Sequence, residues 1–236
     1  MDSELVHCSC NCYTQAMPRL LDLFARAQGT SVGYARAGYE VTASDIATYP
    51  KHPEVHAWVT ADAFDILKDV EYCQQFDIIA LSPNCEGYSS LQYLPTSTPV
   101  PQQIHLVRPL LQRIGKPYVI ENVALARWAM INPIRMCGSA FNLGSMCRDG
   151  NYRQLRRHRL FESNIPLNYP FGCTHAPLTG GVYGTGGGGP QTRGYRFWPE
   201  EARTAMGIDW MGREDICKAI PPVYTETIGR YLLNRI

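Results

Sequence analysis

The sequence predicts an α/β domain built on a doubly wound, Rossmann-like sheet with a small glycine-rich appendage. Two observations predict this class: short apolar runs alternate with helical stretches through the first half of the chain, and polar residues follow several of those runs directly. With 236 residues and 45% hydrophobic content, the chain can bury one sizeable core, so two independent domains are not expected.

The first strand is expected at residues 20–24, where the chain is apolar enough for a buried parallel strand. Gly29, Gly33 and Gly38 then mark a turn and a short helix. Residues 41–44 form the second expected strand. This order is typical of the start of a nucleotide-binding fold.

A third strand is expected around Trp58, and a clearer one at residues 76–81 (FDIIAL), where the run IIAL is apolar and partly β-branched. Residues 103–113 predict a helix that ends before Gly115, and residues 118–120 predict another strand. Alternating strands and helices of this kind favour right-handed crossovers and a parallel sheet.

Polar side chains follow these strands where a buried core would require apolar ones. In doubly wound sheets ligands bind beyond the carboxyl ends of the strands. The residues expected there are Asp45, Asp62, Cys85 and Glu121, together with the turn from Asp22 to Gly29.

The turn after the first strand allows two interpretations. A strand that ends in a glycine-bearing turn, with an acid such as Asp45 about 20 residues further on, can bind the ribose of a nucleotide. The same residues also fit an ordinary strand, turn and helix with a capping acid. Spacing alone leaves both open.

Cys85 lies in a short loop after a strand, a position suited to a nucleophile, although a single cysteine is usually a small buried hydrophobic residue. Glu121 follows the apolar triplet YVI, which favours a catalytic carboxylate over a surface loop cap.

The motifs LDLFARAQGTSVGYARAGYEVTASD, SPNCEGYSS, VIENV, RRHRLFE and AIPPVYTETIG occur in this order. Taken together they resemble the small cytosine carbon-5 DNA methyltransferases of phages and prophages, from about Leu20 to Leu233. The resemblance implies a methyltransferase sheet, S-adenosylmethionine as cofactor, DNA as partner, and methyl transfer to cytosine through a covalent cysteine intermediate.

The resemblance also implies roles for individual residues. Cys85 would attack ring carbon 6, Glu121 would hold a proton at ring nitrogen 3, and Arg157 and Arg159 would orient the ring carbonyl. In the cofactor pocket, Phe24 would contact the sulfonium region, Asp45 the ribose and Asp62 the adenine amino group. The remaining cofactor-binding residues would be Arg26, Gly29, Ser82, Pro83, Tyr224 and Thr225.

Several positions depart from the family pattern. The family turn F-x-G-x-G-G carries Arg26 and Gln28 in place of two glycines, which removes backbone freedom, and Asn84 and Glu86 replace proline and glutamine beside Cys85. Arg26 either points to solvent or faces an anionic group. That group would be the methionine carboxylate or the extra carboxylate of carboxy-S-adenosylmethionine, which would make the chain a carboxymethyltransferase. A catalytically impaired DNA-binding relative is a third interpretation.

Three regions are expected: a catalytic core at 18–160, a reduced target-recognition segment at 161–218, and a C-terminal segment at 219–236 that returns to the core. The glycine-rich stretch TGGVYGTGGGGPQTRGYRFW, with Arg193, Arg196, Tyr183, Tyr195 and Phe197, fits either a segment that orders on DNA or a surface loop.

A net charge of +1 neither supports nor excludes DNA binding. The sequence shows no membrane segment or secretory pattern, so a cytoplasmic protein with reduced cysteines and no obligate protein partner is expected, in a bacterial host if it is phage-encoded. No metal site is predicted. The HCSCNC run at residues 7–12 could bind metal, but its spacing is tighter than in common zinc sites; Cys173 and His175 could supply further ligands, but no four-residue set with recognised spacing occurs.

Overall fold

The computed structural model describes residues 16–88, 100–168, 172–183 and 195–236. Its main element is a seven-stranded sheet in the order β3-β2-β1-β4-β5-β9-β6. The five strands from β3 to β5 are parallel, and β9 and β6 add antiparallel pairs at one side. These strands are β1 (Arg19–Leu23), β2 (Glu40–Asp45), β3 (Ala57–Thr60), β4 (Ile78–Leu81), β5 (Tyr118–Val123), β6 (Ile134–Met136) and β9 (Arg159–Ser163).

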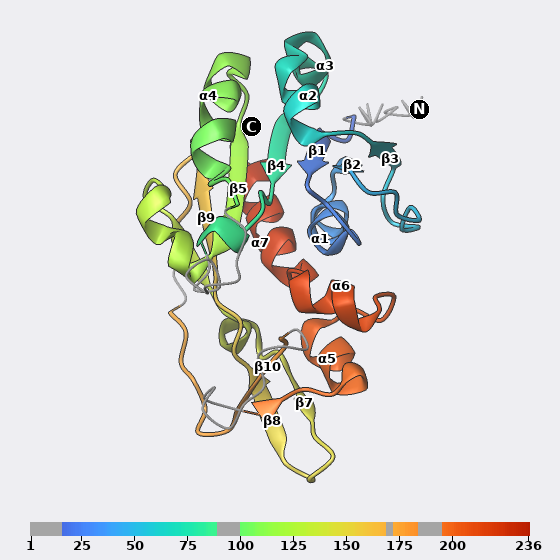
Figure 1. Ribbon diagram of the computed structural model, residues 1–236, viewed down its shortest axis with the longest axis vertical. Coiled ribbons are helices and arrows are strands. Elements are labelled where there is room, and N and C mark those ends of the chain that lie inside the picture. The colour runs from blue at the N-terminus through green and yellow to red at the C-terminus, as the bar shows by residue number, and fades with distance from the viewer. Residues whose placement is uncertain (1–15, 89–99, 169–171, 184–194) are drawn as a thin grey trace, which may run out of the picture.

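Helices cover both faces of this sheet, so the predicted doubly wound class is confirmed (Figure 1). Side chains of β4 alternate between the faces, because Ile78 packs with one cluster and Ile79 with the other. One face carries α1 (Gly29–Ala37) and α7 (Pro222–Leu233), and the other carries α2 (Ala63–Lys68), α3 (Val70–Gln74) and α4 (Ile104–Ile114).

The strands expected from the sequence all form, with small shifts at their ends. The strand expected at residues 118–120 runs to Val123, so Glu121 and Asn122 belong to β5 itself. The strand expected from residue 76 begins at Ile78, since Asp77 instead receives a hydrogen bond at Oδ2 from the Arg19 backbone. The carboxyl ends of β1, β2, β4 and β5 therefore meet at one edge.

Close packing of α1 against α7 depends on Gly33. A Cβ at Gly33 would collide with the carbonyl oxygen of Pro222 and with Oγ1 of Thr225. The Thr225 hydroxyl also contacts Thr30 O at 2.9 Å and Pro222 O at 3.1 Å. These contacts bring the C-terminal helix against the first helix.

A second, four-stranded sheet forms a smaller lobe in the order β11-β10-β8-β7 (Figure 1). The boundary expected at residue 160 falls inside β9 of the main sheet, while residues before it contribute β7 and β8 to the second sheet. The lobe contains β7 (Gly144–Met146), β8 (Tyr152–Leu155), β10 (Thr179–Gly181), β11 (Tyr195–Arg196), α5 (Pro199–Met206) and α6 (Arg213–Lys218).

Much of the described part of the glycine-rich stretch belongs to the core of this lobe. Phe197 is buried against Gly180, whose added Cβ would meet the Phe197 ring at 2.5 Å. Tyr195 donates its hydroxyl to Glu201 at 3.0 Å, whereas Tyr183 is exposed. Arg193 and most of the glycines lie outside the described residues. Among the residues that are described, no helix has both the length and the apolar character needed to cross a membrane.

Candidate active site

A cavity of about 400 Å³ opens at the carboxyl ends of β1, β2, β4 and β5. Its wall contains most of the residues predicted from the sequence, which come from widely separated parts of the chain. The predicted residues that line it are Phe24, Arg26, Gly29, Asp45, Asp62, Ser82, Pro83, Cys85, Glu121 and Arg159. Arg157, Tyr224 and Thr225 are absent from this wall.

The turn after β1 has the left-handed backbone conformation that favours glycine, although other residues occupy these positions. Phe24, Arg26 and Gln28 have φ values of 60°, 45° and 68°, in the left-handed region that side chains with a Cβ rarely adopt. The Arg26 amide donates to Asp45 Oδ2 at 3.1 Å, and the buried Gln28 side chain bonds Pro50 O at 2.8 Å and the His52 amide at 2.9 Å. The expectation that Arg26 and Gln28 remove this conformation is therefore wrong, because these contacts hold the strained turn in place.

The Arg26 side chain lies at the cavity wall rather than in open solvent. Its Nη2 is 3.5 Å from Asp215 Oδ1, a distance typical of a loose ion pair. Its Nε is buried, and among the described residues this nitrogen has no hydrogen-bond partner. A buried donor without a partner costs stability, which suggests that a ligand acceptor completes the site.

Asp22 ties β1 to the start of α1 beneath this turn. The carboxylate accepts hydrogen bonds from the hydroxyls of Thr30 at 2.7 Å and Ser31 at 2.5 Å. Burial raises the pKa of Asp22 to about 6, and these two hydrogen bonds act in the opposite direction. Asp22 is thus a framework residue of the turn rather than part of the cavity wall.

Two acids mark one half of the cavity. Asp45 ends β2 and accepts hydrogen bonds from the amides of Arg26 and Ala47, and Asp62 caps α2 by accepting from the Phe64 amide at 2.7 Å. A carboxylate has about four acceptor positions, so both acids retain capacity for ligand hydroxyl or amino groups.

The structure adds two apolar residues to this half that the sequence reasoning missed. Ile46 follows Asp45 and is 71% exposed, and Phe64 packs edge-on against Phe24. Both line the cavity, where they provide an apolar surface for a flat ring. The sequence signal that could have identified Ile46 is its position directly after Asp45, the predicted ribose-binding acid.

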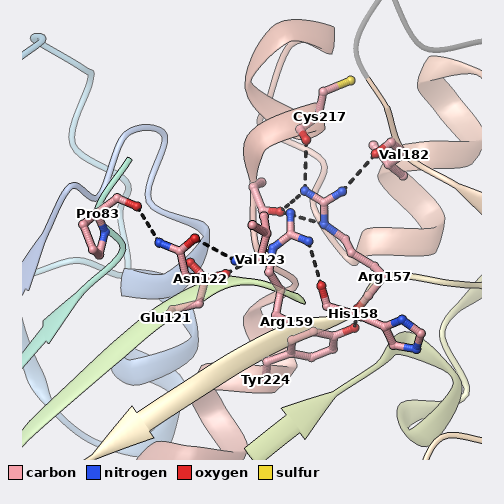
Figure 2. A network of polar contacts seen from close by, with 11 residues as sticks. Pro83, Glu121, Asn122, Val123, Arg157, His158, Arg159, Val182, Cys217 and Tyr224 are labelled. Carbon is pink, nitrogen blue, oxygen red and sulfur yellow. Dashed lines mark hydrogen bonds and ion pairs between the residues drawn. The ribbon is translucent and has the colours of Figure 1, made fainter. Parts of the chain in front are cut away.

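Cys85 precedes a single 3₁₀ turn (Glu86–Tyr88), and hydrogen bonds from neighbouring elements hold its loop. The Asn84 amide donates to Gln103 Oε1 at 2.8 Å, and Asn122 Nδ2 donates to Pro83 O at 2.9 Å (Figure 2). A Cβ at Gly87 would lie 2.7 Å from Val100 O, so glycine is required there. Gln103 and Asn122 are positioning residues that motif matching alone did not identify.

The electrostatic surroundings of Cys85 oppose ionisation of its thiol. The side chain is open to the cavity, but the surrounding walls desolvate it and thereby raise its pKa; the charge of Glu121 raises it further, and Arg159 acts in the opposite direction.

Glu121 and Arg159 form an ion pair at the cavity wall. Arg159 Nε lies 3.1 Å from Glu121 Oε1, with side chains only 14% and 9% exposed (Figure 2). Burial raises the pKa of the Glu121 carboxyl, while Arg159 and a hydrogen bond from Ser82 partly offset that effect. Because its pKa is raised, the Glu121 carboxyl gains and loses its proton at a pH closer to neutral than the carboxyl of an exposed glutamate does.

Arg157 has a different environment from Arg159. Its guanidinium donates to the carbonyls of Ala219, Cys217 and Val182 at distances between 2.5 and 3.0 Å (Figure 2). Burial lowers its pKa to about 9, so it remains cationic at neutral pH beside the C-terminal carbonyls of α6. Arg157 therefore connects the small lobe to the main sheet, and its donors face the backbone rather than a base.

Tyr224 and Thr225 lie behind the cavity wall. The buried Tyr224 hydroxyl donates to Arg157 O at 2.8 Å, and Thr225 joins α7 to α1. The cavity contacts of this region come from Ala219 and Ile220, just before α7. The predicted C-terminal segment thus reaches the site through residues adjacent to those predicted.

No protein-family model matches the chain, and no curated protein matches it. Among solved structures, the methyltransferase EhMeth of Entamoeba histolytica is 12% identical and matches with a TM-score of 0.56, covering 93% of this chain and 99% of that one. A mutant of Spodoptera frugiperda DNMT2 (17% identity, TM-score 0.41) and a SAM-dependent methyltransferase of Agrobacterium tumefaciens (18%, 0.36) cover 69% and 64% of this chain. The chain spans 56% of the length of each of those two. The chain therefore has a Rossmann-like methyltransferase fold.

Proposed function

We propose that this protein transfers a methyl group from S-adenosylmethionine to carbon 5 of cytosine in DNA. The observation that carries the proposal is one cavity that joins Cys85 and the Glu121–Arg159 ion pair to the acids Asp45 and Asp62. Cys85 with Glu121 and Arg159 suits covalent catalysis on a pyrimidine, and the two acids suit binding of a nucleoside cofactor. The methyltransferase fold of the Entamoeba structure agrees with this assignment.

The cavity residues fit S-adenosylmethionine. Asp45 would bind the ribose hydroxyls, Asp62 the adenine amino group, and Ile46 and Phe64 the faces of the adenine. Phe24, Gly29, Ser82 and Pro83 line the path from this half to Cys85, so they would surround the methionine portion. The bound cofactor supplies an electrophilic methyl group on its sulfonium sulfur.

The chain's own residues would activate the base. The Cys85 thiol loses its proton to solvent, and Sγ then forms a bond to cytosine carbon 6 while Glu121 holds a proton at ring nitrogen 3, so electron density shifts to carbon 5. Arg159 would keep Glu121 in position and donate to the ring carbonyl. Carbon 5 then takes the methyl group, which leaves S-adenosylhomocysteine.

Turnover requires that the enzyme be released from the base. A base removes the proton from carbon 5, the bond between Cys85 Sγ and carbon 6 breaks, and Glu121 recovers its proton from nitrogen 3. The result is 5-methylcytosine and a free thiolate. Arg157 and Asn122 would act as positioning residues, since Asn122 holds the backbone of Pro83 near Cys85 and Arg157 holds the backbone of Ala219 at the cavity wall.

DNA recognition would fall to the smaller lobe. Its described residues present one exposed pair of a basic and an aromatic group, with Arg148 over the Trp198 ring at 4.1 Å, and a more buried pair, with Arg153 over Tyr195 at 4.2 Å. Guanidinium groups next to aromatic rings suit contact with phosphates and bases. A recognition segment this small predicts a short target sequence.

Mass spectrometry of nucleosides tests the function directly. The full chain is expressed in a host whose own DNA lacks 5-methylcytosine, with Cys85→Ser as the matched control. We expect 5-methylcytosine in DNA from cells with the wild-type chain and none with the variant. Modification confined to RNA would overturn the choice of DNA, and the absence of any modified cytosine would favour a catalytically impaired DNA-binding relative.

A second candidate function changes only the transferred group. The buried, unpartnered Nε of Arg26 at the cavity wall favours a carboxylate ligand, and carboxy-S-adenosylmethionine carries an additional carboxylate on the transferred carbon. In that case the product would be 5-carboxymethylcytosine, formed by the same Cys85 chemistry.

Competition between the two donors separates these alternatives. If Arg26 binds the transferred carboxylate, Arg26→Ala lowers use of carboxy-S-adenosylmethionine much more than use of S-adenosylmethionine. If Arg26 binds the methionine carboxylate that both donors share, the variant weakens both by the same factor. Unchanged use of both donors would eliminate any role for Arg26 in donor binding.

A further inference from the structure

Four potential metal ligands converge outside the active-site cavity, although they are scattered in the sequence. Cys137 follows β6, His158 lies between β8 and β9, and Cys173 and His175 precede β10. The ligand atoms of all four lie within 4.8 Å of one another. Two cysteines and two histidines form one of the common closed ligand sets of structural zinc sites.

Two of the distances between these atoms match the sulfur-to-nitrogen edges of a zinc tetrahedron. Cys137 Sγ lies 3.5 Å from His175 Nε2, and Cys173 Sγ lies 3.5 Å from His158 Nε2. Bonds of about 2.3 Å from zinc to sulfur and about 2.0 Å to nitrogen, at tetrahedral angles, give a sulfur-to-nitrogen separation of about 3.5 Å. Ion binding would therefore require little movement of these two cysteine–histidine pairs.

The surroundings distinguish this cluster from the reactive cysteine site. Cys137 is buried, His158 and Cys173 are partly buried, and only His175 is exposed. Figure 2 shows the imidazole of His158 directed away from Glu121 and Arg159. The cluster thus lies where the chain passes between the smaller lobe and the main sheet, and none of its four residues lines the active-site cavity.

We propose that Cys137, His158, Cys173 and His175 bind one structural Zn²⁺ ion. The ion would join three separate stretches of chain where the smaller lobe meets the sheet. It would also fix the connection that carries Arg157 and Arg159, because His158 lies between them and its carbonyl accepts from Arg159 Nη1 at 2.8 Å. The ion would position Arg159 without contacting substrate.

Elemental analysis of the purified full chain tests this site. We expect about one zinc per chain, and X-ray absorption should show two sulfur and two nitrogen ligands at about 2.3 and 2.0 Å. Removing the zinc with a chelator should lower the melting temperature, and added Zn²⁺ should restore it. The proposal would be overturned if the chain stays metal-free after incubation with Zn²⁺ under reducing conditions. It would also be overturned if protein prepared under reducing conditions contains a Cys137–Cys173 disulfide.

Matched variants locate the ion. Cys173→Ser combined with His175→Ala should abolish zinc binding. His175→Ala alone, at an exposed position, should leave the protein folded by circular dichroism but release zinc faster to a chelator. Cys147→Ser, outside the cluster, should keep its zinc.

The N-terminal cysteines provide the remaining control. Cys8, Cys10 and Cys12 lie outside the described residues, and serine at all three positions should leave zinc content unchanged. Loss of zinc from that triple variant, with retention in the double variant, would assign the metal to the N-terminus and overturn the proposed site.

Discussion

Backbone strain at Arg26 can be measured by comparing two substitutions. Its φ of 45° costs a residue with a Cβ about 1–2 kcal/mol, whereas glycine adopts it freely but loses about 0.5–1 kcal/mol more chain entropy on folding. The ion pair with Asp215, at 3.5 Å with half-exposed partners, contributes at most about 1 kcal/mol. Both Arg26→Ala and Arg26→Gly remove that pair, but only Arg26→Gly relieves the strain.

We therefore expect Arg26→Gly to be more stable than Arg26→Ala by about 0.5–1 kcal/mol in urea unfolding. Gln28→Gly provides the contrast. It relieves a φ of 68° but removes the hydrogen bonds to Pro50 and His52, so it should destabilise the protein overall. Equal stability of the two Arg26 variants, or greater stability of the alanine variant, would refute the assignment of strain to this turn.

Three further outcomes follow from the geometry. Glu121→Gln should reduce the rate of methyl transfer by about two powers of ten in single-turnover assays with saturating DNA, because the acid at ring nitrogen 3 is lost; an unchanged rate would rule out that role. Glu121→Gln also removes a negative charge that raises the pKa of Cys85. The pH midpoint of iodoacetamide alkylation at Cys85, measured by peptide mass spectrometry, should therefore be lower than in the wild type. A midpoint at the same or a higher pH would contradict an electrostatic effect of Glu121 on Cys85. Gly33→Ala should destabilise the protein by about 1–3 kcal/mol in urea unfolding, because the added Cβ would collide with Pro222. Gly212→Ala, whose added Cβ would meet open space, should change stability by less than about 0.5 kcal/mol. Similar losses of stability in both variants would contradict the packing argument.

The sequence was sufficient to predict the sheet and ten of the residues that line the cavity because both depend on local patterns. Apolar runs such as residues 78–81 are continuous, and cavity-lining residues such as Asp45 and Cys85 lie at or just after the ends of strands. The parallel arrangement then brings those strand ends together without further information.

The remaining features depend on contacts that the chain order does not reveal. Arg157 and Arg159 are two residues apart in one motif, yet one bonds backbone carbonyls of α6 and the other pairs with Glu121. The buried pair of Arg108 and Glu162, 2.8 Å apart, likewise joins α4 to β9 with no motif to indicate it. The cluster of Cys137, His158, Cys173 and His175 also assembles only when three distant stretches of the chain meet.

Covalent trapping tests the central claim most directly. In DNA that contains 5-fluorocytosine, the fluorine at carbon 5 cannot leave as the proton does, so the bond between Cys85 Sγ and carbon 6 should persist after methyl transfer. With S-adenosylmethionine and a library of random-sequence duplexes, we expect a stable protein–DNA adduct whose modified peptide contains Cys85, and no adduct with Cys85→Ser. An adduct on another residue, or methylation of ordinary cytosine without any adduct on the fluorinated base, would contradict the mechanism.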